Sequence, residues 1–189
     1  MSISLSKGGT ISLSKAAGPV LLDLIDVGLG WEGDADLDAS ALICDAGGRC
    51  LSDRDFVFYN NLQSPTAAVV HLGDARTGGD DDGDDETIKV ALSQLPPAAA
   101  RVIFVVSIYE AASTGAGFGT VNSAYVRVVN CANGTELARY DLTSQAAGND
   151  ALVFAELYRD GAGWGFRAIG ESHNRGLAGT LAMYGLNVG

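Results

Sequence analysis

Apolar and polar residues alternate in short stretches along this chain. Residues 2–7, 10–15 and 88–92 show this period of two, which is typical of strands with one face buried. Residues 101–109 are almost continuously apolar, which predicts a strand that is buried on both faces. Helical periodicity is weak throughout, and only residues 177–184 suggest a short helix. The pattern therefore favours an all-β protein with a short C-terminal helical segment.

Glycine-rich turn sequences separate the predicted strands. Gly8-Gly9 predicts a hairpin that pairs residues 2–7 with residues 10–15, and Asn133-Gly134 predicts a second hairpin. Gly28-Leu29-Gly30-Trp31 is interpreted as a loop that ends a strand over residues 20–27. The remaining predicted strands cover residues 39–44, 56–59, 68–72, 124–129, 136–142, 151–159 and 164–170. About ten short strands at this spacing are typical of an antiparallel β-sandwich.

Composition and charge fit one soluble domain with two unusual segments. Of 189 residues, 47% are hydrophobic, which is enough for a sizeable core, and the net charge is −11. Residues 32–38 hold four acids and residues 74–86 hold seven, so these two segments carry a net charge of −10. A surface this acidic argues against binding to nucleic acid and against unassisted docking on anionic membranes. Nearly all of the excess negative charge is therefore concentrated in these two segments.

Three cysteines, Cys44, Cys50 and Cys131, do not describe a disulfide framework, and neither a signal peptide nor a membrane span is recognised. We expect a cytoplasmic protein with reduced thiols. Cys44 and Cys50 flank a predicted hairpin turn and could face each other. No nucleophile elbow, P-loop or dinucleotide fingerprint is found, so an enzyme is not expected.

The two acidic segments have the composition of a calcium site. Calcium binds six to eight oxygen ligands from carboxylates, side-chain amides and backbone carbonyls. The alternating acids Asp34, Asp36 and Asp38, the glycines near residues 73–83 and the amides of Asn60 and Asn61 could supply them. An EF-hand is excluded, because Ala39 stands at the sixth position counted from Asp34. A solvated acidic loop remains the alternative on composition alone.

Sequence motifs across nearly the whole chain resemble the TerD family of tellurite-resistance and stress-response proteins. They are Ser4-Leu5-Ser6-Lys7-Gly8-Gly9, Val27-Gly28-Leu29-Gly30-Trp31, Asp36-Leu37-Asp38-Ala39-Ser40, Phe56-Val57-Phe58-Tyr59-Asn60-Asn61, Gly73-Asp74, Gly83-Asp84-Asp85-Glu86, Val106-Ser107-Ile108-Tyr109, Arg127-Val128-Val129-Asn130 and Glu156-Leu157-Tyr158-Arg159. They occur in the same order as in the family. The combination is specific, although each motif alone is not.

The resemblance implies a single TerD-like domain over residues 1–189 that binds Ca²⁺ through acidic loops at one end of a β-sandwich. Carried over by position, the implied calcium ligands are Asp36, Asp38, Asn60, Asn61, Asp74, Gly83, Asp84, Asp85 and Glu86. The eleven acids of the two segments are enough for two ions. The implied partners are homologous stress-response proteins or a membrane-associated complex. The alternative is a calcium-regulated adaptor that docks on membrane or protein partners.

Two residue types carry further expectations. The four aromatic residues Trp31, Tyr59, Trp164 and Phe166 are expected in the core, because they lie in or beside predicted strands. His71 lies near the second acidic segment and could be a ligand, although ordinary packing in a strand is the simpler interpretation. Zinc is not expected, because two histidines and three scattered cysteines lack zinc-site spacing.

Overall fold

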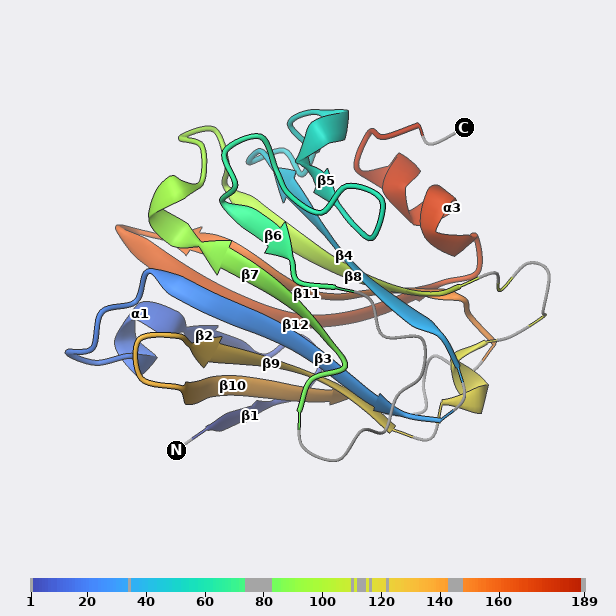
Figure 1. The fold of residues 1–189 in the computed structure, drawn as a ribbon, viewed down its shortest axis with the longest axis horizontal. Helices are drawn as coiled ribbons and strands as arrows, with labels where there is room; N and C mark the ends of the chain where they lie inside the picture. The colour runs from blue at the N-terminus through green and yellow to red at the C-terminus, as the bar shows by residue number, and fades with distance from the viewer. Residues whose placement is uncertain are drawn as a thin grey trace.

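Two six-stranded sheets packed face to face form the protein in a computed structural model (Figure 1). The structure describes residues 2–33, 35–73, 83–109, 111, 115, 117–121, 123–142 and 148–187. Sheet A has the order β1 (Ile3–Leu5), β10 (Thr135–Leu142), β9 (Ser123–Asn130), β3 (Leu24–Glu32), β7 (Glu86–Ala91), β6 (Val69–His71). Sheet B has the order β2 (Thr10–Ser12), β12 (Gly163–His173), β11 (Ala151–Asp160), β8 (Arg101–Ile108), β4 (Leu37–Cys44), β5 (Phe56–Val57). The predicted β-sandwich is confirmed.

Short helical segments join the strands. Among the described residues they are the helices α1 (Leu13–Ala16) and α3 (Gly176–Met183) and the 3₁₀ turns η1 (Asp53–Asp55), η2 (Leu92–Gln94) and η3 (Phe118–Thr120). Helix α3 confirms the predicted C-terminal helical segment to within one residue at each end. No helix in the described part of the chain is both long enough and apolar enough to cross a bilayer.

The predicted N-terminal hairpin is wrong. Strand β1 pairs in parallel with β10 of sheet A, whereas β2 pairs antiparallel with β12 of sheet B. The two glycines between them bind β12, because Gly8 N–H donates to Ala168 O and Ala168 N–H donates to Gly9 O. The left-handed Gly8 (φ 81°) redirects the chain at this point. Alternation predicted the existence of both strands, but not their partners. The second strand ends at Ser12, where α1 begins, and Ile3 of the first is 45% exposed, so the predicted extent to residue 15 and the predicted burial of Ile3 are wrong.

The predicted loop at Gly28–Trp31 is also wrong, because β3 continues through it to Glu32. Trp31 and Leu29 are buried in the core between the sheets, so alternation places Gly28 and Gly30 on the outer face of sheet A. Glycine inside a strand often marks the close approach of another group. The side chain of Asp84 approaches Gly28, and the ring of Tyr125 approaches Gly30.

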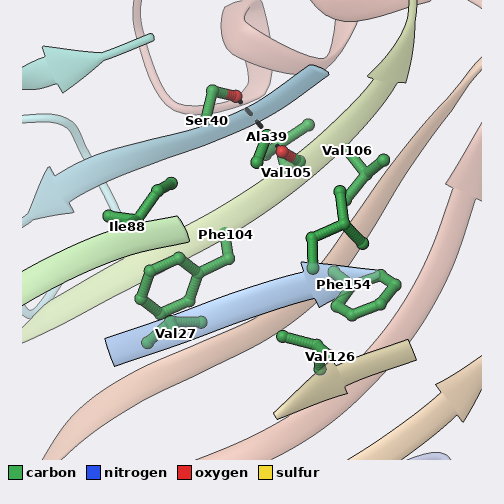
Figure 2. Close-up of a pocket in the computed structure, with 10 residues that line it drawn as sticks. Val27, Ala39, Ser40, Ile88, Phe104, Val105, Val106, Val126 and Phe154 are labelled. Carbon is green, nitrogen blue, oxygen red and sulfur yellow. Dashed lines mark hydrogen bonds between the residues drawn. The ribbon is translucent and has the colours of Figure 1, made fainter. Parts of the chain in front are cut away.

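The core fills the space between the sheets and leaves little room. As predicted, β8 lies inside sheet B and is buried along almost its whole length. Phe104, Phe154, Val27 and Val126 converge on a cavity of about 10 Å³ (Figure 2), which at most matches a single water molecule. This cavity is too small and too apolar to hold a substrate.

A second hydrophobic cluster covers the outer face of sheet B. Leu181 of α3 and Leu186 pack on Leu42, Ile103 and Val153, which are the outward-facing residues of three adjacent strands. Helix α3 therefore shields one half of this face (Figure 1). The other half carries charged residues, among them Arg101, Glu156 and Arg167.

Candidate functional site

Glu86 joins the two sheets at the acidic end of the sandwich. It shares its side of β7 with the core residues Ile88 and Val90, and its side chain points inward. Its Oε2 accepts the backbone N–H of Ala39 in β4 at 2.5 Å, and His71 Nε2 lies 3.6 Å from the same oxygen. The residue is only 2% exposed. A carboxylate at this depth is stable only with hydrogen-bond donors or cations around it.

Asp85, the residue before β7, hydrogen-bonds to the end of β3. Its Oδ2 accepts the backbone N–H of Trp31 at 2.8 Å, and Trp31 Nε1–H donates to Ala35 O at 2.9 Å. These two bonds tie the start of β7 to the end of β3 and to the turn before β4. The described residues of the two acidic segments around Ala35 and Asp85 are therefore linked through Trp31.

Asp84 lies on the outer face of sheet A, directly over Gly28. A Cβ atom at position 28 would come 1.9 Å from Asp84 Oδ2, so only glycine leaves room for this carboxylate. Arg127 of β9 holds it there, with Nε donating to Oδ1 at 2.8 Å. The Asp84 side chain is 10% exposed, so this ion pair is largely shielded from water.

Tyr125 lies next to Asp84 and covers the second strand glycine. Its ring would come within 2.4 Å of a Cβ atom at Gly30, and its hydroxyl donates to Gly83 O at 3.0 Å. The guanidinium of Arg139 stacks on the ring at 3.7 Å. Burial, and after it the charge of Asp84, raises the pKa of Tyr125. Sequence reasoning missed Tyr125 and Arg127 as parts of the site, and the glycines at alternate strand positions were the available signal.

Asp36 immediately precedes β4 and Asp38 is its second residue. Neither lies with the Glu86 side chain between the sheets. Both Leu37 and Ala39 belong to the core, so Asp38 points to the outer face of sheet B, where it is 7% exposed. The half-buried Asp36 accepts the backbone N–H of Tyr109 on its own carbonyl. The acids were expected in loops, but Asp38 and Glu86 are parts of strands.

The amide residues lie in the loop after β5. Asn61 Nδ2 donates to Phe56 O at 2.6 Å and to Arg54 O at 3.2 Å, so this end of the amide closes its own loop. Asn60 is exposed. Asp74 and residues 80–82 lie outside the described residues. Gly83 contributes its carbonyl to Tyr125, as stated above.

The candidate metal ligands therefore all offer oxygen atoms, but they lie in three different layers of the sandwich. Asp84 lies outside sheet A, Glu86 lies between the sheets, and Asp38 lies outside sheet B. All are oxygen donors, as calcium requires. Within the described ranges, no three His, Cys, Asp or Glu side chains are grouped closely enough to hold a metal ion. The donors fit calcium by type, and an ion would have to draw them together.

Cys44 and Cys50 do face each other, as the sequence suggested, and both are free thiols. The hydrogen bonds on either side of the pair are Leu51 N–H to Ile43 O and Asp45 N–H to Arg49 O. The two cysteines thus occupy a non-hydrogen-bonded position, where cross-strand side chains come closest. Their mutual hydrogen bond, and then burial, raises the pKa of Cys44, whereas the same bond lowers the pKa of Cys50.

Comparison with known proteins agrees with this architecture. Residues 1–184 match the TerD domain family. The chain is 48% identical to Tellurium resistance protein TerD of Serratia marcescens, over 99% of each chain. It is 42% identical to General stress protein 16U of Bacillus subtilis, over the full length of both. A crystal structure of a homologue of telluride resistance protein from Streptomyces coelicolor superposes with a TM-score of 0.69 and 25% identity, covering 89% of this chain and all of that chain. The chain therefore belongs to the TerD family of tellurium-resistance and stress-response proteins.

Proposed function

We propose that this protein binds Ca²⁺ at the acidic end of the sandwich and acts in a stress response by binding and not by catalysis. The observation that carries the proposal is the buried carboxylate of Glu86 between the sheets, with Asp85, Asp84, Asp36 and Asp38 at the same end. These acids belong to segments that concentrate almost the whole net charge of the protein. A divalent cation would relieve the repulsion among them.

The residues have different parts in this proposal. Asp85 and Glu86 each accept a backbone N–H group, and a carboxylate has lone pairs for more than one partner. Asp84 is held by Arg127, so calcium and this guanidinium would compete for one carboxylate. Asp36 and Asp38 would approach from β4. The proposed binding is therefore coupled to a rearrangement, and the eleven acids of the two segments are enough for two ions.

Calorimetric titration with calcium, with magnesium as the competitor, tests the proposal. Calcium is expected to bind at least about tenfold more tightly than magnesium, because magnesium dehydrates reluctantly and requires tight octahedral geometry. At a hundredfold excess over its Kd, calcium should stabilise the fold by about 2.7 kcal/mol, which raises the Tm and is reversed by a chelator.

Two variants and one control locate the site. Asp38→Asn and Asp84→Asn are expected to weaken calcium binding strongly. Asp141→Asn removes an acid from the same outer face, but Asp141 is 59% exposed and paired with Arg139, so calcium affinity should hardly change. Equal losses in all three variants that disappear in salt would indicate a diffuse acidic patch and would refute the site.

A second candidate function is calcium-regulated docking on a membrane or on a homologous stress-response protein in the cytoplasm. It is favoured by Tyr59, which was expected in the core but is 37% exposed, and by Tyr109, which is 44% exposed. The two rings contact edge to face at 6.2 Å, close to Asp36. Sedimentation with anionic vesicles, with and without calcium, tests this function, and Tyr59→Ser should abolish any calcium-dependent pelleting. Pelleting that does not depend on calcium would contradict it.

A further inference from the structure

A basic hollow lies on the polar half of the outer face of sheet B, at the opposite end of β4 from Asp38. It has a volume of about 200 Å³ and is lined by Ala46, Ala100, Arg101, Glu156, Tyr158, Arg159 and Arg167. Strand register brings these residues together, because Arg101 pairs with Tyr158, and Glu156 pairs with Arg167. Three adjacent strands, β8, β11 and β12, thus form its floor.

The hollow is positively charged in an otherwise acidic protein. Three of the twelve Lys and Arg residues of the chain line it, against the one carboxylate of Glu156, which gives a local net charge of +2. Arg167 Nη1 forms an ion pair with Glu156 Oε1 at 2.9 Å, and Arg101 Nη1 donates to Glu156 Oε2 at 3.4 Å. Two of the three arginines share this single carboxylate, which leaves an excess of positive charge among the lining residues.

Two acids adjoin residues of the hollow in the chain but do not line it. Asp45 precedes Ala46 in the chain, and its Oδ1 is used by the backbone N–H of Arg49. Asp160 follows Arg159 in an exposed hairpin turn. Arg159 makes no ion pair within the described part of the chain.

The guanidinium groups are held in place and keep donors in reserve. Arg159 stacks on the ring of Trp164 at 4.6 Å and uses Nε to bind Ala99 O at 2.9 Å. Arg167 stacks on the ring of Tyr158 at 5.3 Å. Each guanidinium has five N–H donors, so most remain available in each case. Fixed forks of this kind match the oxygens of a tetrahedral or pyramidal oxyanion.

We propose that this hollow binds hydrogen phosphate, an oxyanion that still carries a hydrogen at neutral pH. The arginines would hold the negative oxygens. Glu156 lines the same space with its side chain only 3% exposed, and it would accept a hydrogen bond from the remaining O–H of the anion. A sulfate ion has no such hydrogen at neutral pH, so its oxygen would face the carboxylate at a repulsive distance. The buried glutamate therefore sets specificity, and the arginines set affinity.

Titration with inorganic phosphate in calcium-free buffer, followed by NMR chemical shifts, tests the proposal independently of calcium binding. Saturable shifts are expected at residues around the hollow. Arg167→Gln should weaken binding by about tenfold or more, as expected for the loss of a charge-assisted hydrogen bond. Arg139→Gln is the matched control, because it removes an arginine from the outer face of the other sheet, and it should leave phosphate affinity unchanged.

The sulfate comparison tests the part assigned to Glu156. The unmodified protein should bind sulfate at least about tenfold more weakly than phosphate at equal ionic strength. Glu156→Gln should reduce that preference, and if this variant does not fold, the comparison on the unmodified protein decides. Absence of saturable phosphate binding, equal affinity for sulfate, or an equal loss in Arg139→Gln would each overturn the proposal. Glycerol phosphate is a further test, because a phosphomonoester has a second pKa of about 6 and has lost most of this hydrogen at neutral pH. It should bind more weakly than inorganic phosphate, and equal or tighter binding would overturn the part assigned to Glu156.

Discussion

The acidic end and the basic hollow share one arrangement of tyrosine, glycine and arginine side by side on the outer face of a sheet, but they carry opposite charges. In each, a tyrosine covers a glycine directly across from it on the neighbouring strand, Tyr125 over Gly30 in sheet A and Tyr158 over Gly165 in sheet B. In each, an arginine stacks on that tyrosine. The carboxylates beside these tyrosines differ in origin, because Asp84 comes from the segment before β7, whereas Glu156 lies within β11.

This difference separates a site built by strands from one built partly by loops. The hollow needs only the register of β8, β11 and β12 to bring its charges together, so it is complete in the folded chain. The acidic end needs segments that approach from three layers of the sandwich, and its carboxylates repel one another. We therefore expect an ion to change the stability of the acidic end much more than an anion changes that of the hollow.

The largest effect is expected when either glycine receives a side chain. Gly30→Val and Gly165→Val each place a Cβ atom about 2.4 Å from a tyrosine ring carbon, so each should lower the free energy of unfolding by about 2–3 kcal/mol. Urea unfolding measures the loss. Calcium stabilisation should be impaired only by Gly30→Val, and phosphate binding only by Gly165→Val.

Gly83→Ala is the matched control for both variants. Nothing lies within 4 Å of a Cβ atom at this position, so the change should stay within about 0.5 kcal/mol. If Gly83→Ala were as costly as Gly30→Val, the tyrosine–glycine contacts would not explain the loss.

The sequence predicted the strands of both regions better than it predicted the regions themselves. Alternation and turn residues identified β7 to β12 closely, because each of these signals is local. Gly28 and Gly30 were interpreted as a loop, since their role depends on Asp84 and Tyr125 in other strands. The hollow was not anticipated, because Arg101, Glu156 and Arg167 are far apart in the chain and meet only through register. The acidic residues were recognised because their charge is concentrated in two short segments.

The second largest effect is expected from Arg127→Gln. Removing the guanidinium leaves the shielded Asp84 carboxylate without its ion pair, which should cost about 1–2 kcal/mol in the absence of calcium. Because the same guanidinium competes with calcium for Asp84, the variant should bind calcium several-fold more tightly. Calorimetry at fixed ionic strength measures this. Weaker calcium binding would show that Arg127 supports the ion site and does not oppose it.

The contact between Cys44 and Cys50, beside the hollow, should affect the reactivity of these thiols more than the stability of the fold. The hydrogen bond from Cys44 lowers the pKa of Cys50, so Cys50 becomes a thiolate at lower pH than an ordinary cysteine. Iodoacetamide should therefore alkylate Cys50 first, with a pH midpoint below 9.0. Cys131 should follow at higher pH, because burial raises its pKa, and fully buried Cys44 should not react. Mass spectrometry of the three peptides measures the order, and faster labelling of Cys131 than of Cys50 would contradict the paired geometry.

The smallest effect is expected from Asp141→Asn, and this variant shows where the acidic site ends. Asp141 Oδ1 accepts Arg139 Nε at 2.8 Å, a distance equal to that of the Asp84–Arg127 pair. The pairs differ in exposure, because the Asp141 side chain is 59% exposed and the Asp84 side chain is 10% exposed. Water and salt screen exposed pairs, so Asp141→Asn should cost less than about 0.5 kcal/mol, and that cost should vanish at high salt. Asp84→Asn should cost more and keep most of its effect in salt. Urea unfolding at low and high ionic strength measures both, and equal, salt-sensitive losses would mean that Gly28 and Arg127 do not set Asp84 apart from the rest of this surface.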